Sequence, residues 1–241
     1  MRISFVIPAF NEEKYIVDCL KSILPLEGLE DFEIIVVDNN STDNTVLTVV
    51  QNFKQAIIIT EKKRGPAAAR NRGAAMATGD YLAFIDADCR LPHLWFLKIR
   101  EILKKKKNVA LLNGPYKFFD DQKFLARVFY FFYSFLFPSI IEFIFRRTLG
   151  IGGVAFGGNF FVPKAIFDKS GGFNEKLEFY ADDVEFANRL EKFGNVIFDT
   201  KLWVYSSARR LKSEGRVKMG LVYTLNGLWI TFFKKVLIRK K

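Results

Sequence analysis

Cysteine and histidine are scarce in this chain of 241 residues, which limits the kinds of site that it can form. The two cysteines, Cys19 and Cys89, are too few for a disulfide framework and lack the spacing of a metal site. They are typical of a protein from a reducing compartment. The only histidine, His93, is expected to be structural, although a metal role stays open.

Long uncharged apolar runs are also missing. The longest ones, Val128–Ile141 and Met219–Phe233, are shorter than the roughly 18–20 residues that a membrane-spanning helix needs. The first residues, Met1–Pro8, run directly into a strand pattern and do not resemble a signal peptide. We therefore expect no transmembrane helix and a cytoplasmic location.

No glycine-rich phosphate loop follows the first strand-like segment, Ile3–Ile7. A dinucleotide dehydrogenase would show Gly-x-Gly-x-x-Gly after a strand, and nucleotidyltransferases usually carry a glycine-rich loop there. This chain continues instead with Pro-Ala-Phe-Asn-Glu-Glu. The sequence therefore argues against both classes, and nucleotidyl transfer is kept only as the alternative enzyme class.

Basic and aromatic residues, by contrast, are abundant. The formal net charge is +11, and from Arg209 to the end only Glu214 opposes ten lysines and arginines. Such an excess indicates nucleic acid, an anionic membrane surface or phosphorylated substrates as partners. Phenylalanine is over-used, with 27 residues, and phenylalanine and tyrosine are crowded in residues 116–145, apart from the basic clusters. This separation favours a membrane surface over nucleic acid.

Strand-like and helix-like segments alternate along residues 3–113. This alternation predicts an α/β fold with a parallel sheet and right-handed crossovers. Ser41 and Thr42 are candidate N-caps for the second helix, and Pro66 suits the first turn of the third. The expected strands are Ile3–Ile7, Glu33–Asp38, Ala56–Thr60, Tyr81–Ile85 and Val109–Asn113, and the expected helices include Glu13–Ile23 and Leu91–Lys107.

Two helical patterns in the second half have a narrow polar stripe on a wide apolar body. One is Phe124–Arg147, which we expect to be kinked or interrupted at Pro138, and the other runs from Val217 toward the C-terminus. Such a helix is either buried in protein or lies in a membrane interface. We expect peripheral membrane binding, with mutual packing of the two helices as the alternative.

Carboxylates follow the ends of two predicted strands. Asp38 ends the second strand, and Asp86-Ala87-Asp88 follows the strand Tyr81–Ile85. In an open α/β sheet, ligands bind beyond the carboxyl ends of the strands. The paired carboxylates Asp86 and Asp88 suit a hard divalent cation that bridges to a phosphate. A nucleotide-linked substrate is therefore expected.

These residues belong to a series of motifs that resembles family 2 of the inverting glycosyltransferases, which have the GT-A fold. The resemblance extends over about residues 3–212. It implies a GT-A-type, Rossmann-like, mostly parallel mixed sheet flanked by helices, followed by C-terminal amphipathic helical segments. The motifs, in order, are Pro8–Glu13, Val36–Asp43, Gly65–Gly73, Asp86–Asp88, Gly157–Phe161, Gly171–Glu175 and Asp182–Glu185.

The resemblance also implies a domain division. Residues 1–212 would form the transferase domain, with a nucleotide-sugar half (1–113) and an acceptor half (114–212) that carries the aromatic insertion 118–149. Residues 213–241 would form a basic, membrane-proximal tail.

The donor site that the resemblance implies begins with a nucleobase packed against the loop after the first strand. The Asp38 carboxylate would accept a hydrogen bond from the base, and Arg70 would face the donor. Asp88 would bind Mn²⁺ or Mg²⁺, with Asp86 on the ribose or a metal-bound water. Alternatives are a capping role for Asp38, a core role for Phe10 and a place for Arg210 in the basic tail. The implied nucleotide-sugar residues are Pro8, Ala9, Phe10, Glu12, Asp38, Arg70, Asp86, Ala87, Asp88 and Arg210.

An inverting transfer needs a carboxylate that deprotonates the acceptor hydroxyl. The resemblance maps this base onto Asp183, although the family's usual Glu-Asp is Asp-Asp here, so Asp182 could orient the acceptor or be the base itself. Both also suit a helix start, because the predicted helix Val184–Phe193 follows. The acceptor side would further include Gly158, Asn159 and Phe173, although the last could belong to a purely structural turn.

The sequence therefore predicts a metal-dependent inverting glycosyltransferase that is peripheral at the inner face of the cell membrane. Its donor would be a UDP- or GDP-sugar, its acceptor a lipid-linked or membrane-proximal glycan, and nucleic acid is not an expected partner. The alternatives are a nucleotidyltransferase on a related fold and a catalytically inactive protein that binds the membrane surface.

Overall fold

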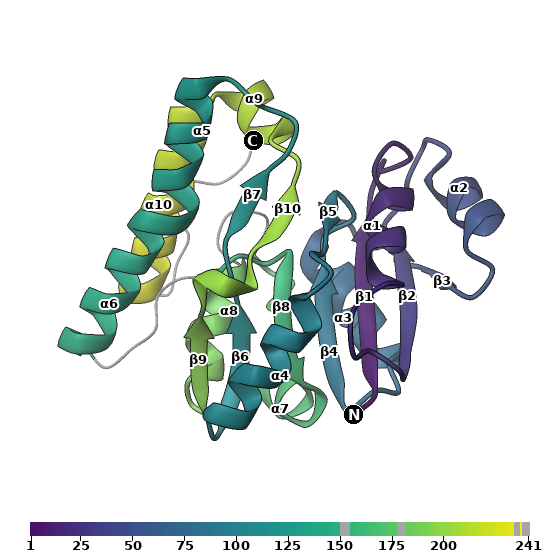
Figure 1. Cartoon of the computed structure of the whole chain (residues 1–241), viewed down its shortest axis with the longest axis horizontal. Coiled ribbons are helices and arrows are strands. Elements are labelled where there is room, and N and C mark those ends of the chain that lie inside the picture. The colour runs from purple at the N-terminus through teal and green to yellow at the C-terminus, as the bar shows by residue number, and fades with distance from the viewer. Residues whose placement is uncertain (150–154, 178–181, 234–236, 238–241) are drawn as a thin grey trace.

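The computed structural model describes residues 1–149, 155–177, 182–233 and 237. Its main sheet has the strand order β3-β2-β1-β4-β8-β6-β9 (Figure 1). Every neighbouring pair is parallel except those of β8, which runs antiparallel to β4 and β6. The expected mostly parallel mixed sheet is thus confirmed. The strands are β1 (Ile3–Ala9), β2 (Phe32–Asp38), β3 (Ile57–Thr60), β4 (Tyr81–Ile85), β6 (Val109–Asn113), β8 (Asn159–Pro163) and β9 (Asn195–Phe198).

Helices cover both faces of this sheet, because its strands are apolar on both sides. Along β1, Phe5 and Ile7 point into one buried cluster and Val6 into the other, as the alternation of a strand requires. The first cluster is completed by α1 (Ile16–Ile23) and α4 (Trp95–Lys105). The second is completed by α3 (Pro66–Met76), α7 (Lys164–Ser170) and α8 (Asp182–Leu190).

A second, smaller sheet lies beyond the carboxyl ends of β1 and β4. Its order is β5-β10-β7, formed by β5 (Cys89–Arg90), β10 (Val204–Ser206) and β7 (Tyr116–Phe118). The 3₁₀ turn Thr200–Leu202 precedes β10, and α9 (Arg209–Glu214) follows it. Because β10 pairs with β5, which closely follows β4, the basic helix α9 after β10 begins near the end of β4.

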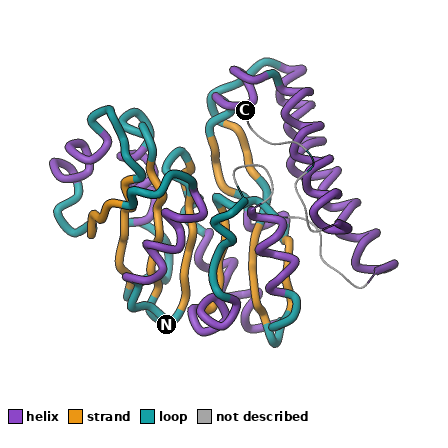
Figure 2. The backbone as a smooth tube through the Cα atoms, turned by 180° about the vertical axis from the view of Figure 1, so that it is seen from behind, coloured by secondary structure: helices purple, strands orange, loops and turns teal. Residues whose placement is uncertain are grey.

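Two long helical segments stand beside the sheets (Figure 1 and Figure 2). The first joins α5 (Phe124–Phe131), a π-helical turn (Phe132–Leu136) and α6 (Phe137–Leu149), and the second is α10 (Arg216–Phe233). They run in the same direction and touch where the backbone of Gly220 lies against the Phe129 ring. Between them and α9 lies a small third core of Ala126, Tyr130, Ala208, Leu211 and Met219.

The apolar stretch of the first helical segment is longer than the uncharged run Val128–Ile141 indicated, although the helix itself agrees with the predicted Phe124–Arg147. Phe124–Ile144 forms 21 residues that are apolar and long enough to cross a membrane, and only 22% of its most apolar stretch is buried. It is the single such helix in the described residues. The uncharged-run criterion missed it because Arg127 and Glu142 interrupt the run of apolar residues without interrupting the helix.

Several local boundaries also differ from expectation. The second helix, α2 (Thr45–Asn52), is not capped by Ser41 or Thr42. The Asp43 carboxylate accepts from the Thr45 amide at 3.0 Å, and the Ser41 hydroxyl accepts from the amide of Asn11. The expected interruption at Pro138 is absent, and the helix continues through this residue. The π-helical turn directly before it accommodates the local change in backbone geometry.

The remaining expectations for the fold have mixed outcomes. Helix α8 begins at Asp182, so both acidic residues lie in its first turn. The predicted tail forms α10 up to Phe233, and most residues after it lie outside the described part of the chain. The division into two halves at residue 113 stays a prediction.

Candidate functional site

A cavity of about 1060 Å³ opens at the carboxyl ends of β1 and β4. Residues from the loops after both strands meet there with the N-terminus of α8 and the segment that follows β10. Of the residues predicted for the site, it is lined by Pro8, Ala9, Phe10, Glu12, Arg70, Asp86, Ala87, Asp88, Gly158, Asp182, Asp183 and Arg210. Three others, Asp38, Asn159 and Phe173, lie away from its wall.

Asp38 is buried at the end of β2, and its carboxylate accepts a hydrogen bond from the Ser41 amide at 3.2 Å. The next residue, Asn39, which sequence reasoning missed, lines the cavity instead. Its side chain donates to the carbonyls of Glu61 and Lys63 and accepts from the Gly65 amide at 2.8 Å. Asn39 therefore orders the loop that leads into α3. A contact between Asp38 and a nucleobase stays a prediction.

Asn159 and Phe173 are structural, which corrects their placement on the acceptor side. The Asn159 side chain is 1% exposed and is fully engaged, since it accepts from the Trp95 indole and donates to the carbonyls of Gly114 and Leu202. The Phe173 ring is 3% exposed and stacks on Phe186 with 4.1 Å between centroids. Neither side chain can reach a ligand in the cavity.

Arg70 joins two parts of the site. It projects from α3, is 5% exposed, and bonds Asp86 through Nη2 at 2.8 Å and Asp182 through Nη1 at 3.0 Å. Burial alone lowers the pKa of Arg70, but the two carboxylates more than offset this effect and raise it above its ordinary value. The buried guanidinium is therefore held charged between the end of β4 and the start of α8.

Two glycines permit this close arrangement. A Cβ on Gly158 would lie 2.3 Å from Asp86 Oδ2 and 2.7 Å from the Tyr116 hydroxyl. The Gly158 amide donates to that hydroxyl at 2.8 Å, and the Gly157 amide donates to Asp183 Oδ2 at 3.2 Å. Side chains larger than glycine would separate these backbone groups from the acidic residues.

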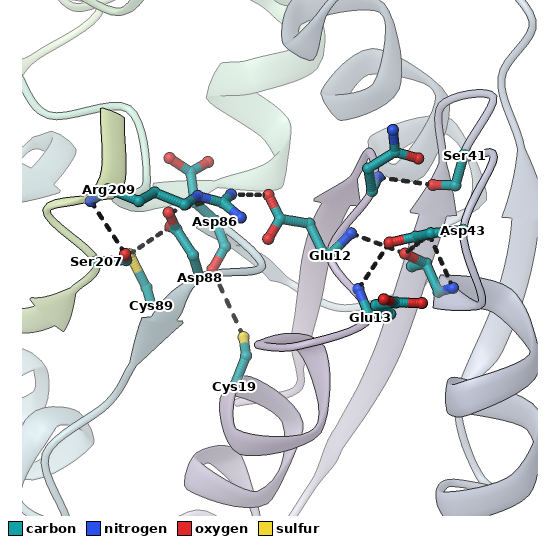
Figure 3. Close-up of polar contacts among 12 residues, drawn as sticks. Glu12, Glu13, Cys19, Ser41, Asp43, Asp86, Asp88, Cys89, Ser207 and Arg209 are labelled. Atoms are coloured by element: carbon teal, nitrogen blue, oxygen red, sulfur yellow. Dashed lines mark hydrogen bonds and ion pairs between the residues drawn. The ribbon is translucent and has the colours of Figure 1, made fainter. Parts of the chain in front are cut away.

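Asp88, Asp86 and Glu12 form an acidic cluster that Arg209 only partly neutralises (Figure 3). The Arg209 guanidinium bonds the Glu12 carboxylate and lies 3.4 Å from Asp88 Oδ2. Burial, followed by the charges of Asp86 and Glu12, raises the pKa of Asp88 to about 7. Burial also raises the pKa of Glu12 in spite of Arg209. The cluster is thus short of positive charge.

This shortage fits a divalent cation. Carboxylate oxygens are the ligands that Mg²⁺ and Mn²⁺ prefer, and Glu12 Oε2 is buried without a hydrogen-bond partner among the described residues. No three histidine, cysteine or acidic side chains in that part of the chain are arranged to hold a metal by themselves. A cation here would therefore take its remaining ligands from a substrate or water.

The arginine in the acidic cluster is Arg209, whereas the sequence assigned this region's donor contact to Arg210. Arg209 also lies over the Tyr15 ring at 4.7 Å. Arg210 lines the cavity further along, 3.3 Å from Glu214 and near the Tyr223 ring. Consecutive residues of a helix point in different directions. The Arg-Arg pair in the sequence therefore does not show which of the two arginines faces Glu12 and Asp88.

Asp183, like Asp88, is a carboxyl group in the cavity with a pKa raised to about 7. Its oxygens accept from the amides of Gly157 and Val184, the latter at 2.8 Å. Burial, followed by the neighbouring charge of Asp182, raises the pKa of Asp183 to about 7. The pKa of Asp182 is also raised by burial, although Arg70 opposes the effect. A carboxyl group with a pKa near 7 is suited to general-base chemistry.

Comparisons with known proteins agree with this geometry. The sequence model of the family described as "Glycosyl transferase family 2" matches residues 4–171. A poly(ribitol-phosphate) beta-glucosyltransferase of Bacillus spizizenii is 38% identical over 95 residues, which cover 36% of this chain and 15% of that protein. Across the curated relatives compared, the matched segments span 15% to 40% of the relative's length.

Two solved structures share the fold. Mannosyltransferase PcManGT from Pyrobaculum calidifontis, in complex with GDP-Man and Mn²⁺, superposes with a TM-score of 0.73 at 18% sequence identity. The superposition covers 98% of this chain and 65% of the PcManGT chain. TarS 1-349 of S. aureus in complex with UDP has a TM-score of 0.66 at 18% identity, with 97% of this chain covering 73% of it. Because the family match extends over most of the chain and the fold agrees with it, this protein belongs to glycosyl transferase family 2.

Proposed function

We propose that this protein is a metal-dependent inverting glycosyltransferase that transfers a sugar from a UDP- or GDP-sugar to a lipid-linked or membrane-proximal glycan. The observation that carries the proposal is the one cavity that Asp86, Asp88 and Asp183 line together. Arg70 bonds Asp86 and Asp182, so the proposed donor and acceptor groups are held together. Such a cavity can hold a leaving diphosphate and a base at once.

The donor would bind along the carboxyl ends of the strands. Pro8, Ala9 and Phe10 would pack against the base, with Asp38 as its hydrogen-bond acceptor and Ala87 between the two aspartates. PcManGT with GDP-Man and TarS with UDP support a nucleoside diphosphate of either kind. Arg209 and Arg210 supply positive charge near the diphosphate, and Arg is suited to bind phosphate oxygens.

A divalent cation would be held by Asp88 and Asp86, with Glu12 beside them. Mn²⁺ in the PcManGT complex supports this metal, and Mg²⁺ prefers the same oxygen ligands. When bound, such a cation offsets the negative charge that develops on the leaving diphosphate. Because Arg209 contacts both Glu12 and Asp88, this residue must move or share these carboxylates with the cation.

Asp183 would act as the base. The acceptor hydroxyl oxygen forms its bond to the anomeric carbon as the bond from that carbon to the phosphate oxygen breaks. The hydroxyl proton passes to the Asp183 carboxylate, and the nucleoside diphosphate leaves with the electron pair. Asp182, which is tied to Arg70, positions the first turn of α8. Gly158 allows the backbone to approach Asp86 closely.

The proposed membrane association rests on an apolar face formed by the two long helical segments. On α10, large apolar side chains recur every three or four residues and are 38% to 65% exposed. Lys123 and Lys218 line a groove beside this face, between the starts of α5 and α10, and their charge suits anionic lipid headgroups; Arg216, which also lines it, is paired with Asp121. The apolar face is formed by Phe124, Leu125, Val128, Phe131, Phe132, Leu136, Phe137, Ile140, Phe143, Ile144, Val217, Leu221, Leu225, Trp229, Phe232 and Phe233.

The short connection between Leu149 and Ala155 favours a first helical segment that lies along the membrane over one that crosses it. Leu149 ends α6, and Ala155, six positions later, is 7% exposed and packs in the core beside the sheet. Six extended residues span at most about 22 Å, whereas the hydrocarbon core is about 30 Å thick. A crossing helix would therefore leave Leu149 too far from Ala155. We propose a peripheral position at the inner face of the cell membrane.

The activity is tested by measuring nucleoside diphosphate release from UDP- and GDP-sugars with Mn²⁺ and membrane-derived glycolipid acceptors. Asp183→Asn and Asp88→Ala should abolish release while the protein stays folded. Asp168→Asn is the matched control, because this aspartate is exposed on α7, lies outside the cavity wall and pairs with the neighbouring Lys164. Near-normal turnover of Asp183→Asn would refute the base, and release of a sugar 1-phosphate in place of the nucleoside diphosphate would favour nucleotidyl transfer.

The membrane position is tested by flotation with vesicles that contain phosphatidylglycerol. The variant Phe124→Ser/Leu125→Ser removes two side chains that are 78% and 80% exposed, so it should weaken vesicle binding without unfolding the protein. Equal flotation of the variant and the wild type, or no flotation of either, would contradict the proposed membrane face.

A further inference from the structure

The cavity does not end at the acidic cluster and the proposed base. It continues between the first helical segment and α10, where its wall is mainly apolar and aromatic. This part of the cavity, here called the α6–α10 groove, is lined by Tyr133, Phe137, Pro138, Ile141, Tyr223 and Gly227. The reaction described above assigns no role to it.

The α6–α10 groove begins next to the proposed base. Val184, which follows Asp183, also lines the cavity, and a Cβ on Gly227 would lie 3.7 Å from its Cγ2. Nearer the start of α10, Gly220 packs directly against the Phe129 ring, so the two helical segments are closed there. Toward Gly227 they enclose open space. A molecule that reaches Asp183 can therefore extend into the groove.

The chemistry of the groove favours a hydrocarbon chain. Polar groups taken out of water need hydrogen-bond partners, and the side chains that offer them among the described residues of the groove are the tyrosine hydroxyls and the nearby Thr224 hydroxyl. Burial also raises the pKa of Tyr133 well above its ordinary value, as expected for a hydroxyl away from water. A glycan segment would leave many of its hydroxyls unsatisfied here, whereas an alkyl chain would not.

Two further observations identify the source of such a chain. The helices that form the groove also carry the exposed residues of the apolar face, and Phe137 belongs to both, so the groove adjoins the proposed membrane face. Arg210 lies over the Tyr223 ring and pairs with Glu214, and both charged residues line the cavity, so the inner end of the groove is polar and suits the head of such a lipid. The groove thus has an apolar wall, a polar inner end and the proposed membrane face beside it.

We infer that the α6–α10 groove binds the hydrocarbon chain of the acceptor, which is an amphiphilic lipid whose hydroxyl-bearing head reaches Asp183. This inference rests on the proposed function and narrows its acceptor to a lipid-linked one. The bond changes are those of the proposed transfer: the lipid head's hydroxyl oxygen attacks the anomeric carbon and its proton passes to Asp183. The groove residues hold the chain and take no part in the chemistry.

Hexyl, octyl and decyl β-D-glucoside, each below its micelle concentration, test the groove by calorimetry. Each added methylene group that enters an apolar groove should tighten binding about fourfold. Gly227→Phe should remove this dependence by filling the groove, whereas Gly227→Ala should keep it, because the added Cβ meets only Val184 at an ordinary distance. Ile141→Trp fills the groove from the opposite wall and replaces Gly227→Phe should that variant not fold.

A control variant separates the groove from the outer apolar face. Leu221→Ser/Leu225→Ser changes two exposed positions of α10, so it should weaken vesicle binding while the dependence on alkyl chain length persists. Loss of that dependence in this control would assign the alkyl binding to the outer face and overturn the inference. Affinities that do not change with chain length in the wild type, or that persist when the groove is filled, would also overturn it.

Donor binding is measured in the same samples with UDP, GDP and Mn²⁺. Binding of a nucleotide without a chain-length effect would refute the lipid groove and leave the proposed transferase intact. A chain-length effect without nucleotide binding would refute the proposed transferase, and with it the acceptor role of the bound amphiphile. Both effects together are the expected result.

Discussion

The pKa of Asp183 makes a quantitative prediction about the pH dependence of the reaction. A base acts in its deprotonated form, so a carboxyl group with a pKa raised to about 7 becomes inactive as the pH falls through 7. About one molecule in eleven is deprotonated at pH 6 and about ten in eleven at pH 8. We therefore expect kcat/KM to rise about tenfold between these values and to level off above them. An aspartate with the ordinary pKa of about 3.9 would produce no change in this range.

The assay is nucleoside diphosphate release at low substrate concentration, from pH 5.5 to 8.5 at constant ionic strength. Mn²⁺ must be saturating at every pH, because the pKa of Asp88 is also about 7 and a bound cation replaces its proton. Asp182→Asn supplies the matched variant. It removes the charge that, after burial, most raises the pKa of Asp183, so the midpoint should move to lower pH. A flat wild-type profile from pH 6 to 8, or an unchanged midpoint in the variant, would refute the reasoning.

Three other predictions follow from the contacts of the site and the core. Arg209→Met removes the partly exposed ion pair between Arg209 and Asp88, which is worth up to about 1 kcal/mol. In the absence of nucleotide, Mn²⁺ should therefore bind about fivefold more tightly, as measured by electron paramagnetic resonance. Unchanged affinity would show that Arg209 does not compete with the cation. Gly158→Ala places a Cβ 2.3 Å from Asp86 Oδ2 and should lower kcat/KM about a hundredfold in a folded protein, with activity close to wild type as the contrary result. Phe173→Ala should lower the free energy of unfolding by about 3–5 kcal/mol in urea titrations, whereas a specific loss of acceptor binding at full stability would return Phe173 to the acceptor site.

Much of the fold could be predicted because local rules agree with the tertiary structure. The strand Tyr81–Ile85 is a short apolar run, and the Asp86 that ends it must lie at the sheet edge where ligands bind. The position of β8 could not be predicted in the same way. It pairs antiparallel with both β4 and β6, and such long-range pairing leaves no periodic signal in the sequence.

The sequence predicted which segments of the chain line the candidate site, because the motifs fix their backbone. It did not predict which residue of a motif points into the cavity, because that depends on the direction of each side chain. Asn159 belongs to the Gly-Gly-Asn motif, yet its amide turns inward to Trp95 and two carbonyls, while Gly158 beside it lines the cavity. Phe173 follows two glycines with φ angles of 80° and 71°, and that turn directs its ring into the core. Neighbouring residues thus have opposite environments that a short motif does not distinguish.

The guanidinium of Arg70 couples the evolution of two distant segments of the sequence, those that contain Asp86 and Asp182. It pairs with both Asp86 and Asp182, so loss of Arg70 leaves two carboxylates without the counter-charge that they share. A substitution of Arg70 can then persist only when the carboxylates change as well. Descendants of this chain that lose Arg70 should therefore lose these acidic residues too, and divergence in donor choice around Asp86 should be limited by the needs of the acceptor side.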